Sequence, residues 1–332
     1  MPRKVRLWIL GLAIVLVVLA GWIAANQPGY RLASMPNPNG YDDFLRAANE
    51  IVGVPGNFAS LTKEELESLI ATNAEVLRLV RVGLGRTCSA PTDVLITNFP
   101  AVQSHWAVQK ALAQLLIAEG YLAESEQRPD DAVKSYLDAV HFGTDVARGG
   151  MMINLLVGVA CESMGLSRLV KLAPSLECDR QRAIATKLLE LDRGRCDWND
   201  IMRVERQFAR YQARGKPMAW VVYWFQARRL NANGALKYNQ MSARLRLLAT
   251  ELALRCYRSG HSNAPTSLTL LVPDYLAAVP LDPFTQQPLI YRGRGTNWLL
   301  YSVGVDGTDD GGKRAPNRAA TAKRDLFYDS WW

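Results

Sequence analysis

At 332 residues, the chain is long enough for two modest domains. Hydrophobic residues make up 49% and charged residues 21% of it, which excludes a largely disordered chain. The net charge is +8, but three of the positive charges lie together at Arg3, Lys4 and Arg6. The remaining excess is too small by itself to indicate nucleic acid as a partner.

The N-terminal segment predicts a membrane anchor. Residues 7–25, LWILGLAIVLVVLAGWIAA, are 19 residues without a charge, and a helix of that length spans about 28 Å, close to one bilayer core. The charged residues before it are all basic, so the N-terminus is expected in the cytoplasm and the bulk of the chain outside. A cleaved signal peptide is the alternative, but Trp22 or Ile23 stands where its cleavage site needs a small residue. We expect a tail and anchor in 1–25, a linker in 26–40 and a single-pass inner-membrane protein whose bulk is periplasmic or otherwise extracytoplasmic.

Residues 41–235 are expected to form an irregular α-helical domain, because their apolar residues recur mainly at helical spacing. Thr62 and Glu65 have the spacing of a capping box, which predicts a helix from there to about Arg81. The apolar stretch MMINLLVGVA at 151–160 is too short to cross a membrane and predicts a core helix.

A more specific pattern lies in LLIAEGYLAESEQRPDDAVKSYLDAV, residues 115–140. Gly120, Ala132, Tyr136 and Ala139 have the spacing of a tetratricopeptide hairpin, which places small residues where two helices touch and a ring between them. Pro129 is expected at a helix start. No second copy follows at the period of about 34 residues, and one copy cannot build a solenoid. This pattern predicts either a peptide-binding groove or a single helical hairpin within an irregular domain.

The segment 201–229 combines arginines on one helical face with a run of aromatic residues. The four arginines fall within roughly 80° of a helical wheel. This pattern predicts either a membrane-interface patch for anionic head groups or a solvated arginine face followed by an aromatic core helix. The members of the predicted patch are Arg203, Arg206, Arg210, Arg214, Trp220 and Trp224.

Five cysteines leave at least one of them unpaired. An extracytoplasmic location permits disulfides, and Cys178 and Cys196 are one candidate pair that the sequence does not decide. Cys161 lies in an apolar helical run and is expected in the core.

Residues 236–332 differ in character from the rest. A helix ends at CYRSGH, proline-rich LVPDYLAAVPLDPF follows, and PLIYRG and NWLLYSV are expected to form an antiparallel hairpin. The acidic stretch YSVGVDGTDDGG comes directly after it. In this order the pieces resemble the globular domain of the type II secretion major pseudopilin over about residues 243–312. The resemblance implies a small α+β module.

In that family the corresponding acidic loop binds calcium, so the resemblance implies a Ca²⁺ site at Asp306, Asp309 and Asp310, with the backbone carbonyl of Ser302. Three carboxylates within five residues repel one another unless they are solvated or bound to a cation, and Ca²⁺ prefers such oxygens. A solvated Gly-Asp turn is the alternative. The chain departs from pseudopilins in lacking the glutamate near the start of the hydrophobic helix, so a processed pilus subunit is not expected.

The chain is predicted to be mainly α, with an N-terminal transmembrane helix, the irregular α-helical domain and the pseudopilin-like module. No catalytic motif occurs and the histidines are scattered, so no enzyme is expected. The predicted function is a structural or adaptor protein of the bacterial cell envelope, linked to a type II secretion-like system and acting on envelope protein partners. The alternative is a peptide- or glycan-binding module that uses a helical groove. Nucleic acid is not expected as a partner.

Overall fold

The computed structural model describes residues 34–54, 58–214, 216–314 and 324–330, with positions 8, 11, 12, 14–20 and 23 of the N-terminal segment. It is mainly helical, with a two-stranded antiparallel sheet, as predicted. The elements in chain order are α2 (Gly40–Glu50), η1 (Phe58–Ser60), α3 (Lys63–Thr72), α4 (Ala74–Leu84), α5 (Thr92–Thr97), α6 (Phe99–Ser125), α7 (Pro129–Ala147), α8 (Met152–Leu172), η2 (Ala173–Ser175), α9 (Cys178–Arg193), α10 (Trp198–Gln212), α11 (Pro217–Gly260), η3 (Leu268–Leu271), β1 (Ile290–Arg294) and β2 (Asn297–Tyr301).

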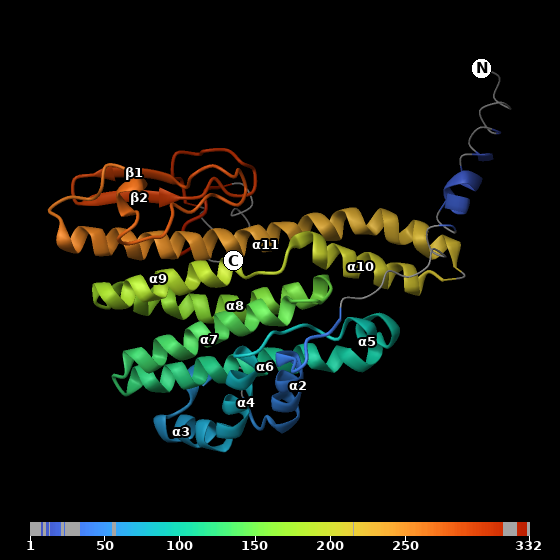
Figure 1. Cartoon of the computed structure of the whole chain (residues 1–332), viewed down its shortest axis with the longest axis horizontal. Helices are drawn as coiled ribbons and strands as arrows, with labels where there is room; N and C mark the ends of the chain where they lie inside the picture. The colour runs from blue at the N-terminus through green and yellow to red at the C-terminus, as the bar shows by residue number, and fades with distance from the viewer. Residues whose placement is uncertain are drawn as a thin grey trace.

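Figure 1 shows the long helix α11 lying between two parts of the molecule. On one side α11 packs on α8 and α9, and α7 contacts α6, α8 and α9 in turn. Helices α2 to α4 lie beyond α6. On the other side α11 carries the β-hairpin and the loops around it.

The two faces of α11 enter two different hydrophobic clusters. Leu245 and Leu248 belong to the large cluster of the helices, while Leu247 and Leu254 belong to a smaller one with residues of the hairpin and its loops. We call α2–α10 with the first face of α11 the helical body, and residues 261–314 and 324–330 with the second face the C-terminal module. The expected domain boundary at 235/236 falls within α11, which runs unbroken through it.

Close contacts between small residues bring the helices of the body together. A Cβ built on Gly143 would lie 2.4 Å from the carbonyl oxygen of Gly158, and one on Gly158 would lie 2.3 Å from that of Gly143. Helices α7 and α8 therefore meet backbone to backbone at this point. At the α6–α7 contact, a Cβ on Gly120 would lie 2.4 Å from the ring of Tyr136, which is fully buried. The predicted hairpin of α6 and α7 is present, and α7 begins at Pro129 as expected.

The capping box at the start of α3 is confirmed, but the predicted single helix from there to Arg81 is wrong. The Thr62 hydroxyl accepts from the Glu65 amide at 3.2 Å, and the Glu65 carboxylate accepts from the Thr62 amide at 2.8 Å. The helix is interrupted at buried Asn73, whose amide group donates to the carbonyls of Val52 and Leu69. These bonds hold Asn73 outside helical geometry, so α3 ends and α4 begins around it.

One segment of the described chain, Met152–Ser175, is long and apolar enough to cross a membrane, and half of its apolar window is buried inside the protein. It contains α8, where the sequence predicted a core helix, and Cys161 and Leu155 within it are fully buried. The predicted N-terminal span at 7–25 is described in part: its described positions, among them 14–20, are helical and mostly exposed. A membrane anchor there stays a prediction.

The predicted β-hairpin of the C-terminal module is confirmed. β1 pairs with β2 from Ile290↔Tyr301 to Arg294↔Asn297. The two-residue turn contains Gly295 at φ +56°, a backbone conformation that favours glycine. Ser302 continues the pairing by a bridge to Leu326.

A disulfide joins the body to α11. Cys178, the first residue of α9, is bonded to Cys256 of α11, and their Cα atoms are 5.0 Å apart. The candidate pairing of Cys178 with Cys196 is therefore wrong, and Cys196 is free. The two partners are 78 residues apart in the chain and meet only because α9 packs on α11.

Candidate functional site

The four predicted calcium ligands of the acidic loop are engaged with protein groups. The buried Ser302 uses its backbone amide and carbonyl in the bridge to Leu326, at 2.9 and 2.8 Å. One oxygen of Asp306 accepts from the Thr308 amide at 3.1 Å. The Asp310 carboxylate lies 3.7 Å from the Arg324 guanidinium.

Asp309 is the most heavily bonded carboxylate of the loop. Its Oδ1 accepts from the Tyr301 hydroxyl at 2.6 Å and from the Gly311 amide at 2.8 Å, and its Oδ2 accepts from Arg292 at 3.0 Å. These bonds, that of Tyr301 first, lower the pKa of Asp309. Within the described residues no three acidic, histidine or cysteine side chains are arranged to hold a metal. The loop carboxylates therefore do not form a ready set of ligands, and calcium binding stays a prediction.

The predicted arginine patch is only in part a continuous surface. Arg203, Arg206 and Arg214 are exposed, but Arg210 is half-buried. Arg203 pairs with Asp200 at 2.7 Å. Helix α10 is amphipathic as predicted, and the side chains of Trp220 and Trp224 lie outside the described residues.

A groove between α4 and the α6–α7 hairpin brings together charged residues that the sequence did not connect. The groove holds a cavity of about 310 Å³. Leu122 and Ala123 contribute apolar surface to it. Its full lining is Ile70, Arg81, Glu119, Leu122, Ala123, Arg128, Asp131, Lys134 and Ser135. We call it the hairpin groove.

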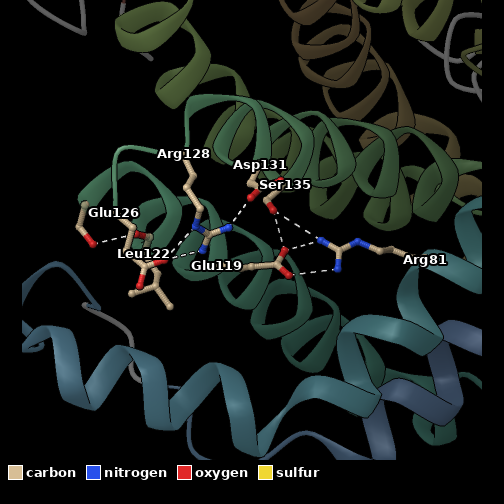
Figure 2. A network of polar contacts seen from close by, with 8 residues as sticks. Arg81, Glu119, Leu122, Glu126, Arg128, Asp131 and Ser135 are labelled. Atoms are coloured by element: carbon tan, nitrogen blue, oxygen red, sulfur yellow. Dashed lines mark hydrogen bonds and ion pairs between the residues drawn. The ribbon is translucent and has the colours of Figure 1, made fainter.

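Glu119 is the centre of the polar network in the hairpin groove (Figure 2). Arg81 of α4 donates from both terminal nitrogens to its carboxylate, one of them at 3.0 Å, and Ser135 of α7 donates to it at 2.6 Å. The Nε of Arg81 donates to Asp138 at 3.0 Å. One arginine thus fastens α4 to both helices of the hairpin by a two-point contact with a carboxylate.

The pKa values in this network follow from partial burial and charge pairing. Burial alone would lower the pKa of Arg81, but its hydrogen bonds to Glu119 and Asp138 outweigh this effect and raise it. Burial raises the pKa of Asp138 by more than Arg81 lowers it. The Arg81 guanidinium therefore stays charged and fixed as part of the wall of the hairpin groove.

At the open end of the groove, Arg128 lies between two carboxylates (Figure 2). Its Nε donates to Glu126 at 3.0 Å, and a terminal nitrogen donates to Asp131. Lys134 lines the same groove and is exposed; its charge lowers the pKa of Asp138, but no described carboxylate lies within ion-pair distance of it. Its ammonium is therefore the cation of the groove that is available to a carboxylate from outside the chain.

The sequence contained only part of the signal for the hairpin groove. The spacing of Gly120 and Tyr136 predicted the hairpin, but nothing indicated that Arg81 would reach Glu119, 38 positions later. Lys134 and Ser135 follow Asp131 by three and four positions, which places these three residues on one face of α7, toward the groove. No protein-family model, curated protein or solved structure matches this chain.

Proposed function

We propose that the chain is a membrane-anchored, extracytoplasmic adaptor of the bacterial cell envelope that holds a segment of a partner protein in the hairpin groove. The observation that carries this proposal is the groove itself, a cavity with an apolar floor and fixed charges and one lysine that has no ion partner among the described residues. A link to a type II secretion-like system rests on the resemblance of the C-terminal module.

The chemistry of the groove favours a peptide over a glycan. Glycan sites commonly offer an aromatic ring for stacking, and the described residues that line this groove include none. Leu122 and Ala123 offer apolar contact, while Lys134 offers an ion pair. An extended segment with an apolar residue near an acidic one fits both features.

The disulfide supports the proposed location. Disulfides persist in oxidising compartments such as the periplasm and are rare in the cytosol, and Cys178 is bonded to Cys256. An alkaline phosphatase fused to the C-terminus is expected to be active and a cytoplasmic reporter at the same place silent. The reverse pattern would contradict an extracytoplasmic location.

Site-directed photo-crosslinking in intact cells tests the adaptor role. A photoreactive amino acid at Lys134 is expected to capture a discrete envelope partner, and the same amino acid at Arg182, an exposed position on α9, serves as the control. Lys134→Glu, assayed with a second groove crosslinker at Asp131, is expected to reduce the yield of that product, whereas Arg182→Glu leaves it unchanged. Equal capture from both positions, or none at Lys134, would contradict the proposal.

A further inference from the structure

The C-terminal module contains a second concave site that the proposed function does not use. A cavity of about 260 Å³ lies between the C-terminal half of α11, β2 and the chain around Phe327. Three arginines, Arg255, Arg258 and Arg314, line it. The other lining residues are Glu251, Asn297, Trp298, Leu299, Leu300, Phe327 and Tyr328. We call it the arginine cleft.

Two of the arginines in the cleft lie over aromatic rings. The Arg258 guanidinium is 5.2 Å from the ring centre of Trp298, and that of Arg314 is 4.1 Å from the ring centre of Phe327. Phe327 is buried and Trp298 half-buried, so both rings belong to the fixed wall of the cleft. Stacking on a ring orients the plane of a guanidinium and leaves its edge nitrogens available to a ligand.

Glu251 forms the back of the cleft and is already satisfied. Its Oε1 accepts from Arg255 at 2.7 Å, and its Oε2 accepts from the Trp298 indole at 2.8 Å. Arg314 pairs with Asp329 at 2.7 Å, whereas the Arg258 guanidinium, besides lying over the Trp298 ring, donates to the carbonyl of Thr296 at 3.5 Å. The lining thus holds three arginines and one carboxylate, and Arg258 forms no ion pair with a described residue.

We propose that the arginine cleft binds a carboxylate of an acidic peptide segment on a partner protein. Arginine matches a carboxylate by two parallel hydrogen bonds, and Arg258, which forms no ion pair with a described residue, can offer such a fork. The cavity is smaller than the range of about 300–1,000 Å³ that is usual for drug-sized ligands, so it accommodates one acidic side chain or a chain end. The site lies on the C-terminal module and does not depend on the hairpin groove.

A lipid surface fits these features less well than a peptide. Proteins that bind at a membrane interface project aromatic and aliphatic side chains outward into the lipid. Here the Phe327 ring is buried and the Trp298 ring half-buried in the wall, and the cations line a concavity rather than a convex face.

The direct test is peptide binding to the full chain in detergent, followed by fluorescence anisotropy. The probe is a fluorescein-labelled glutamate-rich peptide, with a lysine-rich peptide of the same length as the negative control. Arg258→Gln is expected to weaken binding about tenfold, which is the size expected for one charge-assisted contact. Arg294→Gln changes an exposed arginine of β1 that does not line the cleft and is expected to leave binding unchanged.

A variant that improves binding separates the proposal from simple damage. Glu251→Gln removes the competing negative charge while its amide oxygen still accepts from Trp298, so the acidic peptide is expected to bind several-fold more tightly. Lys134→Glu in the hairpin groove is expected to leave unchanged the part of the binding that Arg258→Gln removes, which separates failure here from failure of the adaptor role.

Three results would overturn the proposal. The first is no preference for the acidic over the lysine-rich peptide, and the second is equal weakening by Arg258→Gln and Arg294→Gln. The third is binding of phosphatidylglycerol vesicles with the same Arg258 dependence when the peptide does not bind, which would assign the cleft to lipid.

Discussion

The helical body and the C-terminal module share α11 but satisfy their buried charges in different ways. In the body, buried ions pair between segments that are separated in the chain: Glu162 of α8 pairs with Arg195, which lies between α9 and α10, and both side chains are almost completely buried. In the module, buried carboxylates bind backbone amides of nearby turns. Asp325 accepts from the amides of three residues of the acidic loop, and Asp282 accepts from those of Phe284 and Val303.

This difference indicates where each part is vulnerable. The body depends on the fit between helix surfaces, so a change in side-chain volume has a large effect there. The module has a small core and a two-stranded sheet, which is marginal by itself, so it depends on single carboxylates, on packing against α11 and on the disulfide next to it.

Among the changes that test this difference, removal of the disulfide is expected to have the largest effect on stability. The bond joins residues 78 positions apart, and closing a loop of that size raises the free energy of the unfolded chain by about 4.5 kcal/mol. We expect Cys178→Ser with Cys256→Ser to lower the melting temperature by circular dichroism, and the amides of the module to exchange faster than those of the body.

The matched control for this change is Cys196→Ser, which alters a half-buried free cysteine. We expect it to have a much smaller effect. If the double variant and the control melted alike, the disulfide would not hold the module to the body.

Overpacking the α7–α8 contact is expected to have the next largest effect on stability, and this effect arises in the helical body. Gly143→Ala places a methyl group against the carbonyl of Gly158, which the helices must relieve by moving apart. We expect a loss of about 2–3 kcal/mol in the free energy of unfolding, measured by urea titration.

Gly85→Ala is the control for the same chemical change. Gly85 has φ −82°, and the nearest atom to its built Cβ is 3.5 Å away, so alanine is expected to be neutral or stabilising by about 0.5 kcal/mol. If the two substitutions gave similar losses, the close approach of α7 and α8 would not limit the stability of the body.

Features that depend on adjacent residues could be predicted from the sequence, whereas features that depend on residues far apart in the chain could not. The capping box at Thr62, the helix start at Pro129 and the hairpin turn at Gly295 each depend on a few adjacent residues, and each is present. The end of α3 at Asn73 depends on Val52, 21 positions earlier, so no local pattern revealed it. The Cys178–Cys256 bond likewise depends on how helices pack.

The candidate sites show the same limit. The hairpin groove needs Arg81 to reach across to Glu119, and the arginine cleft needs α11, β2 and Phe327 to come together. Sequence spacing could place each residue on a helix or strand, but not the elements beside one another. The acidic loop could be recognised as a loop, whereas Asp325, which accepts from its amides, lies 12–15 positions further along the chain.

Removal of the Asp325 carboxylate is expected to have an intermediate effect, confined to the module. Asp325 is 3% exposed, and its oxygens accept from the amides of Asp310, Gly312 and Lys313 at 2.8–3.3 Å. Asp325→Ala leaves these donors without their acceptor at a cost of about 2 kcal/mol. We expect faster hydrogen exchange in residues 310–313 and unchanged exchange in α7.

Asp306→Ala is the control for this prediction, because Asp306 is exposed and accepts from one amide. We expect it to change exchange only near Thr308. Loss of protection throughout the body after Asp325→Ala would show that the module is not a separate cooperative part of the molecule.

The smallest expected effect concerns pH, and here two carboxyl groups, one in each part, are expected to respond with opposite sign. Burial raises the pKa of Glu205 in the body, so its contribution to stability is present below its ordinary pKa and is lost as pH rises through the raised value. The pKa of Asp309 in the module is lowered. The contribution of Asp309 is therefore present above the ordinary value of about 4 and is lost as pH falls through the lowered one.

The acid titration of Asp309 also ranks the groups that hold it. The Tyr301 hydroxyl is the leading cause of its lowered pKa, ahead of the Gly311 amide and of Arg292. The Gly311 amide donates to this carboxylate, so its nuclear magnetic resonance shift reports the protonation of Asp309. We expect Tyr301→Phe to raise the midpoint of that titration more than Arg292→Gln does, because the short hydrogen bond favours the ionised form more strongly than the exposed, solvent-screened arginine. Asp309→Asn should abolish the titration, and the reverse ranking of the other two variants would mean that charge pairing, rather than the hydroxyl, sets the acid limit of the loop.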